Sequence, residues 1–295
     1  MLDNLFFITA KTYAYFYFYI KKFTGLRIRG LGFLLRRISK PKIIRYKNKK
    51  LYLNPKVISS YGVNIINKYQ EKETVLFLDL VMKSLNSSHE KVNFIDVGSN
   101  IGIFLLQMSS YENINRVVGF DPAIGCVEAA IKTLELNEFN RFKIYNNLVG
   151  SSNEEKLYSN DIDPQGASVY KTKDNKKSKL VKQIRLDDNK SIKELSENIQ
   201  TIVLIDVEGY EPEVIKGGIQ MIQKNKPLLI FEYNIVSKKH YSVDIINSLL
   251  GDNWIIFRLR KDGLLDNKVE NAWNCIAIDK NSIYPNLFRI LNLYS

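Results

Sequence analysis

Acidic side chains recur at the ends of apolar runs in this sequence, and their type and spacing suit them to chemistry. Asp96, Asp121, Asp206 and Glu232 each lie in or directly after a short apolar run, and Glu208 follows Asp206 by two residues. Such runs, bounded by turn residues, are typical of buried strands. Because ligands of open α/β sheets bind beyond the carboxyl ends of the strands, these carboxyl groups are expected around one ligand site.

The segment Asp96-Val-Gly-Ser-Asn-Ile-Gly102 predicts a strand end, a glycine turn and the start of a helix. It differs from the dinucleotide pattern G-x-G-x-x-G, because Asp96 stands at the first glycine, and it lacks the Lys-Ser/Thr of a P-loop. Gly98 and Gly102 allow the backbone to approach a ligand, and the N–H groups of the following helix suit a carboxylate or phosphate. An acid facing the ligand favours a cofactor with a cationic group.

S-adenosylmethionine, with its ammonium and sulfonium groups, is the cofactor that fits this pattern. We expect Gly98, Asn100 and Gly102 to bind its methionine part, and Asp96 to orient the ammonium or the turn itself. Asp121 ends a second expected strand, 25 residues after Asp96, close to the ribose-binding spacing of α/β nucleotide folds. We therefore predict that Asp121 binds the ribose hydroxyls. The alternative is a helix N-cap, since a helical pattern follows at 123–136.

The elements that must position these acids predict an α/β fold with a single large sheet. Helical periodicity follows the first two strands and the run at 201–206, and the interval 150–180 is expected to be a loop with a short hairpin. A helix is expected from Asp187 to Leu195. The predicted strands are residues 94–97, 116–121, 141–145, 182–186, 201–206, 227–232, 254–258 and 274–278.

The sequence resembles the FkbM family of S-adenosylmethionine-dependent methyltransferases over roughly residues 70–235. The resemblance implies a class I methyltransferase fold, Rossmann-like, with a mostly parallel seven-stranded sheet and helices on both faces, here in a domain spanning 71–295. It also implies O-methylation, most often of a sugar or another hydroxyl. Leu204 departs from the family, which usually has Lys before the Ile-Asp pair. The matching motifs are Asp96–Gly102, Phe120-Asp-Pro122, Leu186-Asp-Asp188, Ile205-Asp-Val-Glu-Gly-Tyr-Glu211 with Lys216-Gly217, and Pro227–Glu232.

Methyl transfer to a hydroxyl needs in-line alignment of oxygen and methyl group, and a group that takes the hydroxyl proton. Asp206 is the first candidate, as general base or as a carboxylate that orients the acceptor, and Glu208 is the next. His240 is either a base on a loop or an exposed side chain. Glu211 either binds the acceptor or favours the start of a helix.

Glu232 is expected to bind the acceptor. Its alternatives are a divalent metal site shared with Asp206 and Glu208, and internal charge pairing with Lys or Arg. No metal is included in the predicted function. A non-catalytic, membrane-tethered protein would require a defective cofactor loop, and the residues from Asp96 to Gly102 are intact.

Positive charge is concentrated in the first 70 residues, although the whole chain carries +12. Residues 1–70 contain 15 Lys and Arg and one acid, Asp3, whereas residues 71–295 contain 28 basic and 30 acidic side chains. The sequence therefore predicts a basic, aromatic-rich extension at 1–70 ahead of a nearly neutral catalytic domain. A stripe of apolar residues with helical spacing at 31–38 predicts that this extension is helical.

Two interpretations of the extension stay open. Asp3 and the absence of a small-residue cleavage site argue against a secretory signal. A spanning helix needs about 20 apolar residues, whereas the run at 5–20 has 16 and contains Lys11. Residues 1–40 either lie at the surface of an anionic membrane, on its cytoplasmic side, or pack on the fold as a helical cap.

A nucleic-acid acceptor would also suit a basic face. The N/D-P-P-Y/F signature of amino-group methylation is missing, however, and Asp163-Pro-Gln165 does not supply it. We therefore expect a small-molecule or glycan acceptor. Cys126 and Cys275 are too few and too distant for a disulfide framework or a cysteine-based metal site, which favours a reducing, cytoplasmic location.

Overall fold

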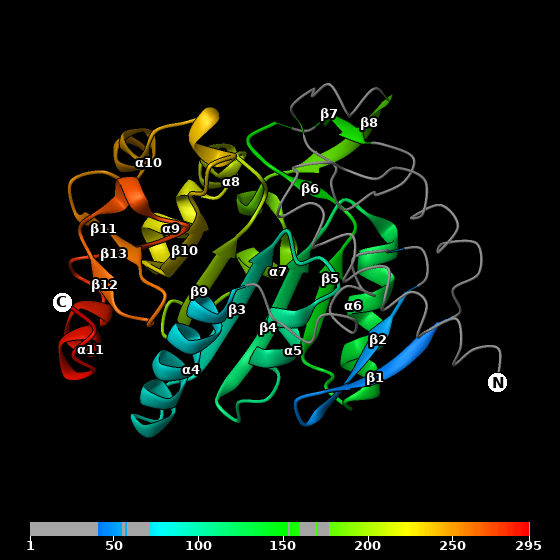
Figure 1. Ribbon diagram of the computed structural model, residues 1–295, viewed down its shortest axis with the longest axis horizontal. Helices are drawn as coiled ribbons and strands as arrows, with labels where there is room; N and C mark the ends of the chain where they lie inside the picture. The colour runs from blue at the N-terminus through cyan, green and yellow to red at the C-terminus, as the bar shows by residue number, and fades with distance from the viewer. Residues whose placement is uncertain are drawn as a thin grey trace, which may run out of the picture.

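In the computed structural model, a large sheet lies between layers of helices (Figure 1). The structure describes residues 41–54, 57, 71–152, 154–159, 169 and 177–294, and the predictions for residues 1–40 lie outside these. Within the described residues the sheet has eight strands in the order β12-β11-β13-β10-β9-β3-β4-β5. The strands from β5 to β10 are parallel. They are β3 (Val92–Val97), β4 (Ile114–Phe120), β5 (Phe142–Tyr145), β9 (Gln200–Ile205) and β10 (Leu228–Glu232).

The C-terminal part of the sheet is antiparallel. Strand β13 (Asn274–Asp279) lies between β10 and β11 (Trp254–Leu259) and runs antiparallel to both. Strand β12 (Leu265–Asp266) pairs with the end of β11. The expected mostly parallel α/β sheet is confirmed, but its expected count of seven strands is one too low in the described residues. The eighth strand is β12, which has two residues and is too short to leave a periodic pattern in the sequence.

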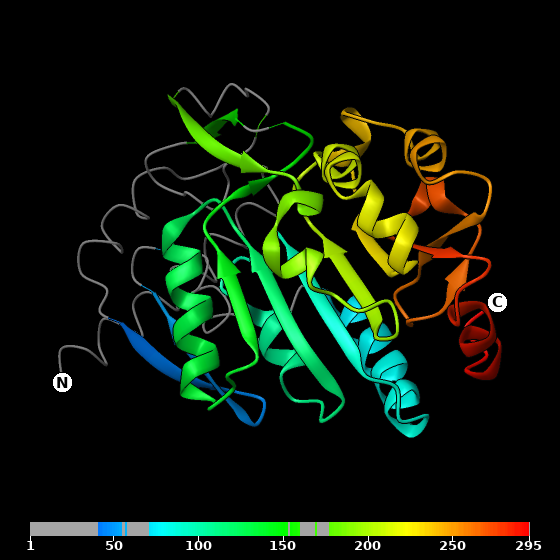
Figure 2. The ribbon, with the colours of Figure 1, turned by 180° about the vertical axis from the view of Figure 1, so that it is seen from behind.

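Helices cover both faces of the sheet (Figures 1 and 2). One face packs against α4 (Lys72–Ser87), α5 (Ile103–Met108), α6 (Ile124–Leu136) and α11 (Tyr284–Ile290). The other face packs against α7 (Lys190–Lys193), α8 (Glu211–Gly217), α9 (Ile219–Asn225) and α10 (Val243–Leu250). Burial on both faces explains why the parallel strands are nearly continuous apolar runs.

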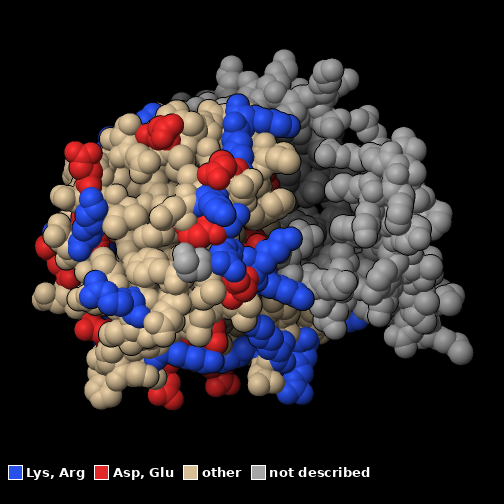
Figure 3. Space-filling model, turned by 60° about the vertical axis from the view of Figure 1, so that its left-hand side comes forward, with Lys and Arg blue, Asp and Glu red and all other residues tan. Residues whose placement is uncertain are grey.

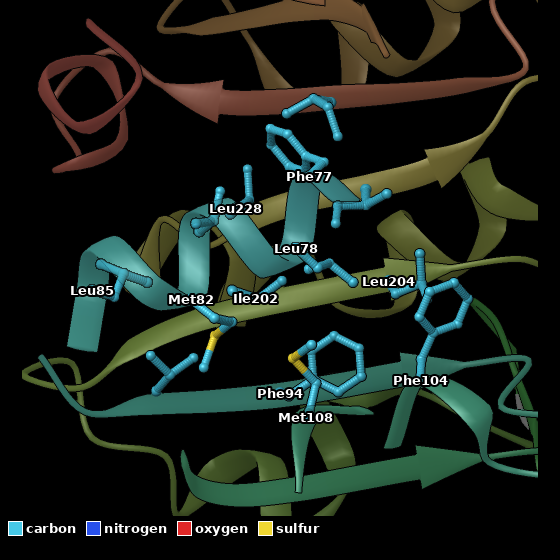
Figure 4. Packing of buried hydrophobic residues seen from close by; sticks show 14 of the residues in the cluster. Phe77, Leu78, Met82, Leu85, Phe94, Phe104, Met108, Ile202, Leu204 and Leu228 are labelled. Carbon is cyan, nitrogen blue, oxygen red and sulfur yellow. The ribbon is translucent and has the colours of Figure 1, made fainter. Parts of the chain in front are cut away.

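Figure 4 shows the first of these two cores, where α4 and α5 meet the strands. Leu78 and Met82 of α4 lie near Ile202 of β9, while Met108 of α5 lies beside Phe94 of β3. All five side chains are completely buried. Since a fully buried side chain of this size contributes about 2 kcal/mol, this core fixes α4 firmly on the sheet.

Residues 42–53 correct the expectation of a helical extension. They form an antiparallel hairpin of β1 (Lys42–Tyr46) and β2 (Lys49–Leu53), joined by a turn in which Lys47 has φ 51°. Leu51 and Leu53 are fully buried and share a core with Ala129 of α6. This part of the basic segment therefore packs on the catalytic domain.

The interval after β5 contains a second, smaller sheet. The pairing of β7 (Glu154–Ser159) with β8 (Lys177–Ile184) is antiparallel, and β6 (Leu148–Val149) lies parallel to β8. This agrees with the expected short hairpin. The expected helix from Asp187 to Leu195 is instead a 3₁₀ turn, Leu186–Asp188, followed by the short helix α7. The reason is that the Asp187 carboxylate accepts the N–H groups of Gln220 and Met221 at the start of α9, 3.1 and 2.9 Å away.

Charges of both signs intermingle on the described part of the face seen in Figure 3. This agrees with the nearly balanced composition of residues 71–295. In the part of the chain that the structure describes, no helix combines the length and apolar character needed to cross a membrane.

Candidate active site

Strand alternation brings three of the predicted acids to the same face of the sheet. Side chains of a strand point alternately to its two faces. In β3, β9 and β10, the residues in phase with Asp96, Asp206 and Glu232 belong to the core under α4, while the intervening residues face the other core. The N–H of Asp206 bonds to the carbonyl of Val97, 2.9 Å away, so the pairing of β9 with β3 continues to this residue. The three acids therefore gather at the carboxyl edge, on the side of α4.

The glycine turn lies directly against the Asp206 segment. Gly98 has φ 88°, and a Cβ there would lie 2.0 Å from the carbonyl oxygen of Asp206. Gly102 has φ 78°, and its Cβ would lie 2.8 Å from that of Ala130 in α6. Asn100 also has a positive φ, 51°. Glycine is thus required at 98 and 102 by the close approach of protein segments, which holds the turn beside the strand ends.

Asp121 connects the glycine turn to the start of α6. One carboxylate oxygen accepts the N–H of Asn100 at 2.9 Å, and the other accepts the N–H of Ala123 at 2.8 Å. Burial raises the pKa of Asp121 to about 6, although these two N–H groups oppose the shift. Asp121 is not the N-cap that we considered as an alternative, because Ala123 holds that position and Asp121 accepts its N–H. The predicted ribose contact stays a prediction, and it would use the remaining lone pairs of the same carboxylate.

Asp96 is almost inaccessible, with 1% of its surface exposed. Its Oδ2 atom has no hydrogen-bond partner among the described residues. Burial raises its pKa well above the ordinary value, and the nearby Asp206 and Asp121 raise it further. A buried carboxylate without a partner is costly, so this position favours either a bound proton or a cationic ligand.

Asp206 and Glu232 form a carboxyl pair at the ends of β9 and β10. Ile205 and Phe231 are partners in the parallel register, and each acid is the residue that follows one of them, so the two acids lie side by side. The carboxyl groups are within hydrogen-bonding distance of each other when one of them is protonated. Burial, and then the charge of Asp206, raise the pKa of Glu232 to about 10, while burial and then Glu208 raise that of Asp206 to about 7. Burial and the repulsion between the two carboxyl groups favour a shared proton, and Glu232, which has the higher pKa, holds it more strongly.

The loop after β9 is shaped by Glu211. The side chain of Glu211 is fully buried, and its Oε1 accepts the N–H groups of Val207 and Gly209 at 3.1 and 3.2 Å. Glu211 was expected either to bind the acceptor or to favour the start of a helix. The structure supports the second interpretation, because Glu211 is the first residue of α8 and its carboxyl group stabilises the loop from inside.

Glu208 lies on this loop, and His240 packs against the glycine that follows it. Glu208 is exposed and has φ 57°, a strained value for a residue with a side chain. The ring of His240 packs over Gly209, where an added Cβ would lie 2.7 Å from its Cδ2. Partial burial, and then Lys239, lower the pKa of His240. The structure thus brings both predicted residues to the loop that carries Asp206.

Glu71 belongs to the same cluster and was missed by the sequence analysis. It lies directly before α4, whose first turn is tied to β13 by a buried hydrogen bond of 2.8 Å from Asn274 to Thr74. The Glu71 carboxyl group hydrogen-bonds to the same Asn274 side chain. Burial, and then the charges of Asp206 and Asp96, raise the pKa of Glu71 to about 8. An acid directly before a helix that leads into the glycine-loop strand was the available signal.

Within the described residues, the alternative of internal charge pairing is not observed for this cluster. The ion pairs found there do not include Asp96, Asp206 or Glu232. The same part of the chain contains no group of three or more His, Cys, Asp or Glu side chains arranged to hold a metal ion.

Comparison with known families identifies the family to which the chain belongs. Residues 96–252 match the Methyltransferase FkbM domain, from the acid of the glycine turn to the helix after β10. This match covers more than half of the chain. The chain belongs to the FkbM methyltransferase family. The resemblance inferred from the sequence motifs is confirmed, and so is S-adenosylmethionine as the methyl donor. Glu71, Thr74 and Asn274 lie outside the matched residues.

The solved structures that match this chain include three proteins of low sequence identity. The FkbM methyltransferase from Methylobacillus flagellatus KT is 17% identical, with a TM-score of 0.42, over 64% of this chain and 44% of that one. SMU.1697c, a putative methyltransferase from Streptococcus mutans in complex with SAH, is 11% identical, with a TM-score of 0.41, over 68% and 96%. TYW2 from M. jannaschii in complex with AdoMet is 10% identical, with a TM-score of 0.40, over 82% and 85%. A search of curated proteins found no match.

Proposed function

We propose that this FkbM methyltransferase transfers a methyl group from S-adenosylmethionine to a hydroxyl group, most suitably of a sugar in a glycan or glycolipid. The observation that carries the proposal is the Asp206–Glu232 carboxyl pair at the strand ends, in which the two groups lie within hydrogen-bonding distance and Asp206 has the lower pKa. A hydroxyl acceptor must lose its proton during transfer, and a carboxylate with a pKa near the working pH is suited to receive it.

The cofactor fits the residues around the glycine turn. S-adenosylmethionine supplies a methyl carbon bound to a positively charged sulfur. The unpartnered Oδ2 of Asp96 suits its ammonium group, while Gly98, Asn100 and Gly102 hold the turn against which the methionine part binds. The carboxylate of Asp121 accepts the ribose hydroxyls. Two backbone N–H groups hold the Asp121 carboxylate before any ligand arrives, which favours alignment.

In the reaction, the acceptor oxygen forms a bond to the methyl carbon as the bond from carbon to sulfur breaks. Asp206 takes the hydroxyl proton. The protonated carboxyl group of Glu232 donates a hydrogen bond to Asp206 and so orients the Asp206 carboxylate. Glu208, exposed on the same loop, contacts the acceptor. His240, beside Gly209, is the alternative base, since its lowered pKa leaves it neutral near pH 7.

An exposed apolar edge beside the carboxyl pair supports a saccharide acceptor. The Trp273 side chain is 56% exposed, and its carbonyl accepts the N–H of Tyr233, the residue after Glu232, at 2.8 Å. Ile235 is 72% exposed on the segment that follows. Aromatic side chains at binding sites offer a flat apolar face together with a polar edge, which matches the C–H face and the hydroxyl groups of a pyranose ring.

The acceptor can be identified by comparing the methylated glycans of cells with and without this protein. We expect one methyl ether to disappear from a glycan or glycolipid fraction, and the purified protein to restore it when supplied with S-adenosylmethionine. A loss of methylation confined to nucleic acid would contradict the proposed acceptor.

We further propose that residues 1–40 contact an anionic membrane at its cytoplasmic side, which would bring the enzyme to a glycolipid acceptor. The proposal is supported by the aromatic run at 5–20 and by the excess of Lys and Arg over acids in this segment. Flotation of the full chain and of a chain lacking residues 1–40 with anionic and neutral vesicles tests it. Equal recovery of both chains with anionic vesicles would contradict it.

A further inference from the structure

The acids of the cofactor site come from elements on three sides, and one of them lies outside the matched family domain. Asp96 lies in β3, Asp206 directly follows β9, and Glu71 directly precedes α4. Asn274 of β13 holds Glu71 in place and pairs in register with Glu232 of β10. Since α4 is fixed by its buried core, the position of Glu71 is set by the fold.

Among the described residues, the charged groups that act on Glu71 are all acids. They are Asp206 from β9, Asp96 from β3, Glu232 from β10 and Glu73 from its own helix. An acidic cluster alone does not define a site, but Asp96 of this cluster is 99% buried and its Oδ2 atom has no hydrogen-bond partner among the described residues. No described Lys or Arg forms an ion pair with Asp96, Asp206 or Glu232, and a cationic ligand would supply a positive charge here.

We propose that Glu71 belongs to the cofactor site and that its carboxylate, with those of Asp96 and Asp206, makes the enzyme bind the cationic methyl donor more tightly than the uncharged-sulfur product S-adenosylhomocysteine. This inference rests on the proposed cofactor site. Transfer of the methyl group removes one positive charge from the ligand while the carboxylates remain. The loss of that attraction favours release of the product after each turnover.

The same arrangement links cofactor binding to proton release. Without ligand, the raised pKa of Glu71, about 8, keeps its carboxyl group protonated near neutral pH. A cation in the cluster favours the ionised form and expels the proton. Affinity for the cationic donor should therefore rise with pH until about pH 8, and affinity for the product should rise less.

Calorimetry on the full chain with S-adenosylmethionine and S-adenosylhomocysteine at pH 6.5 and pH 8.5 tests the proposal. We expect Glu71→Gln to weaken binding of the donor about tenfold at pH 8.5 and binding of the product less than about threefold. The donor-to-product preference of the variant should lose its dependence on pH. Glu90→Gln is the matched control, because it removes one acid just before β3, at the opposite edge of the sheet, and it should leave both affinities unchanged.

Three outcomes would overturn parts of this account in distinguishable ways. If the wild-type protein binds neither ligand, the proposed cofactor site is wrong. If it binds both and Glu71→Gln weakens them equally, Glu71 is a structural residue without a role in charge selection. If Glu71→Gln changes neither affinity, Glu71 lies outside the site. Circular dichroism and thermal unfolding establish that the variant is folded, and proton release by the wild-type protein, measured in two buffers of different ionisation enthalpy, tests the linkage without any variant.

Discussion

Acidic side chains occur at two edges of the same sheet, and their surroundings shift their pKa values in opposite directions. At the outer edge, Asp266 of β12 receives the Nε–H of Arg258 at 2.9 Å in a bidentate pair, which lowers the pKa of Asp266. At the carboxyl edge of the parallel strands, Asp96, Asp206 and Glu232 lack basic partners among the described residues, and their pKa values are raised.

This difference in pairing distinguishes acids that stabilise the fold from acids that are available to bind a ligand. A paired carboxylate stabilises its surroundings in the folded state, whereas an unpaired buried carboxyl group costs folding energy. A cluster of the second kind at the ligand-binding edge of an α/β sheet is evidence of function. Removal of an acid should therefore have opposite consequences at the two edges.

The largest effect is expected for Asp206→Asn. Removal of the proton acceptor should lower methyl transfer about 10²- to 10⁴-fold, a larger effect than the accompanying loss of affinity for the cationic donor. Transfer of labelled methyl groups to a glycan fraction measures the rate, and calorimetry measures the affinity. Asp266→Asn is the control, and it should keep the wild-type rate. Full turnover by a folded Asp206→Asn protein would remove Asp206 from the chemistry.

Gly98→Ala tests the close contact between the glycine turn and the Asp206 segment. A Cβ at 98 would meet the Asp206 carbonyl at 2.0 Å and would also require a positive φ, so we expect a loss of about 3 kcal/mol in unfolding free energy. Gly251 has the same φ, 88°, with nothing within 4 Å of its added Cβ. Gly251→Ala should therefore cost less, about 2 kcal/mol, because only the backbone strain at φ 88° and ψ 175° remains. Equal costs in denaturant unfolding would contradict the steric argument.

Asp121→Asn tests the predicted ribose contact. The amide keeps one oxygen for the N–H groups of Asn100 or Ala123 but loses the second acceptor and the charge. We expect cofactor affinity to fall about 10- to 100-fold, measured by calorimetry. If affinity is unchanged while the variant becomes less stable, Asp121 serves only the turn and the helix start.

The smallest effect is expected on the stability of the protein, where substitutions of Glu232 and Asp266 should have opposite signs. The folded-state pKa of Glu232 lies near 10, above that of the unfolded chain, so its stabilising contribution is complete at low pH and is lost as pH rises toward 10. Glu232→Gln should therefore stabilise the ligand-free protein at pH 9 by about 1 kcal/mol, with no gain at pH 4. Asp266→Asn should destabilise it slightly at both pH 7 and pH 9. Thermal unfolding of both variants across this pH range checks the signs.

Much of the fold was predictable because its signals are local. The runs at 94–97, 116–121, 201–206 and 227–232 are apolar on both faces, and each became a parallel strand. Since parallel strands end at one edge of the sheet, the grouping of their terminal acids also followed from the sequence. The glycine spacing predicted the turn correctly for the same reason.

The rest depends on contacts that local patterns do not contain. The hairpin at 42–53 was missed because its lysines were attributed to a helical extension, whereas Leu51 and Leu53 find their core on α6. Glu71 joins the site only because α4 packs with its start beside β13, some 200 residues later in the chain. Glu211 points inward because Glu208 and Gly209 both have positive φ values, a loop shape that strand and helix patterns do not specify.

The most direct test of the central claim concerns Asp96, whose buried, unpartnered oxygen should meet the cationic cofactor. Calorimetric titration of S-adenosylmethionine into the wild-type protein and into Asp96→Asn at pH 8 measures this contact. We predict saturable binding to the wild-type protein and binding at least about tenfold weaker to the variant, with unchanged circular dichroism. Equal affinity of the two folded proteins would contradict the claim that the unpaired carboxyl groups at this edge hold the methyl donor.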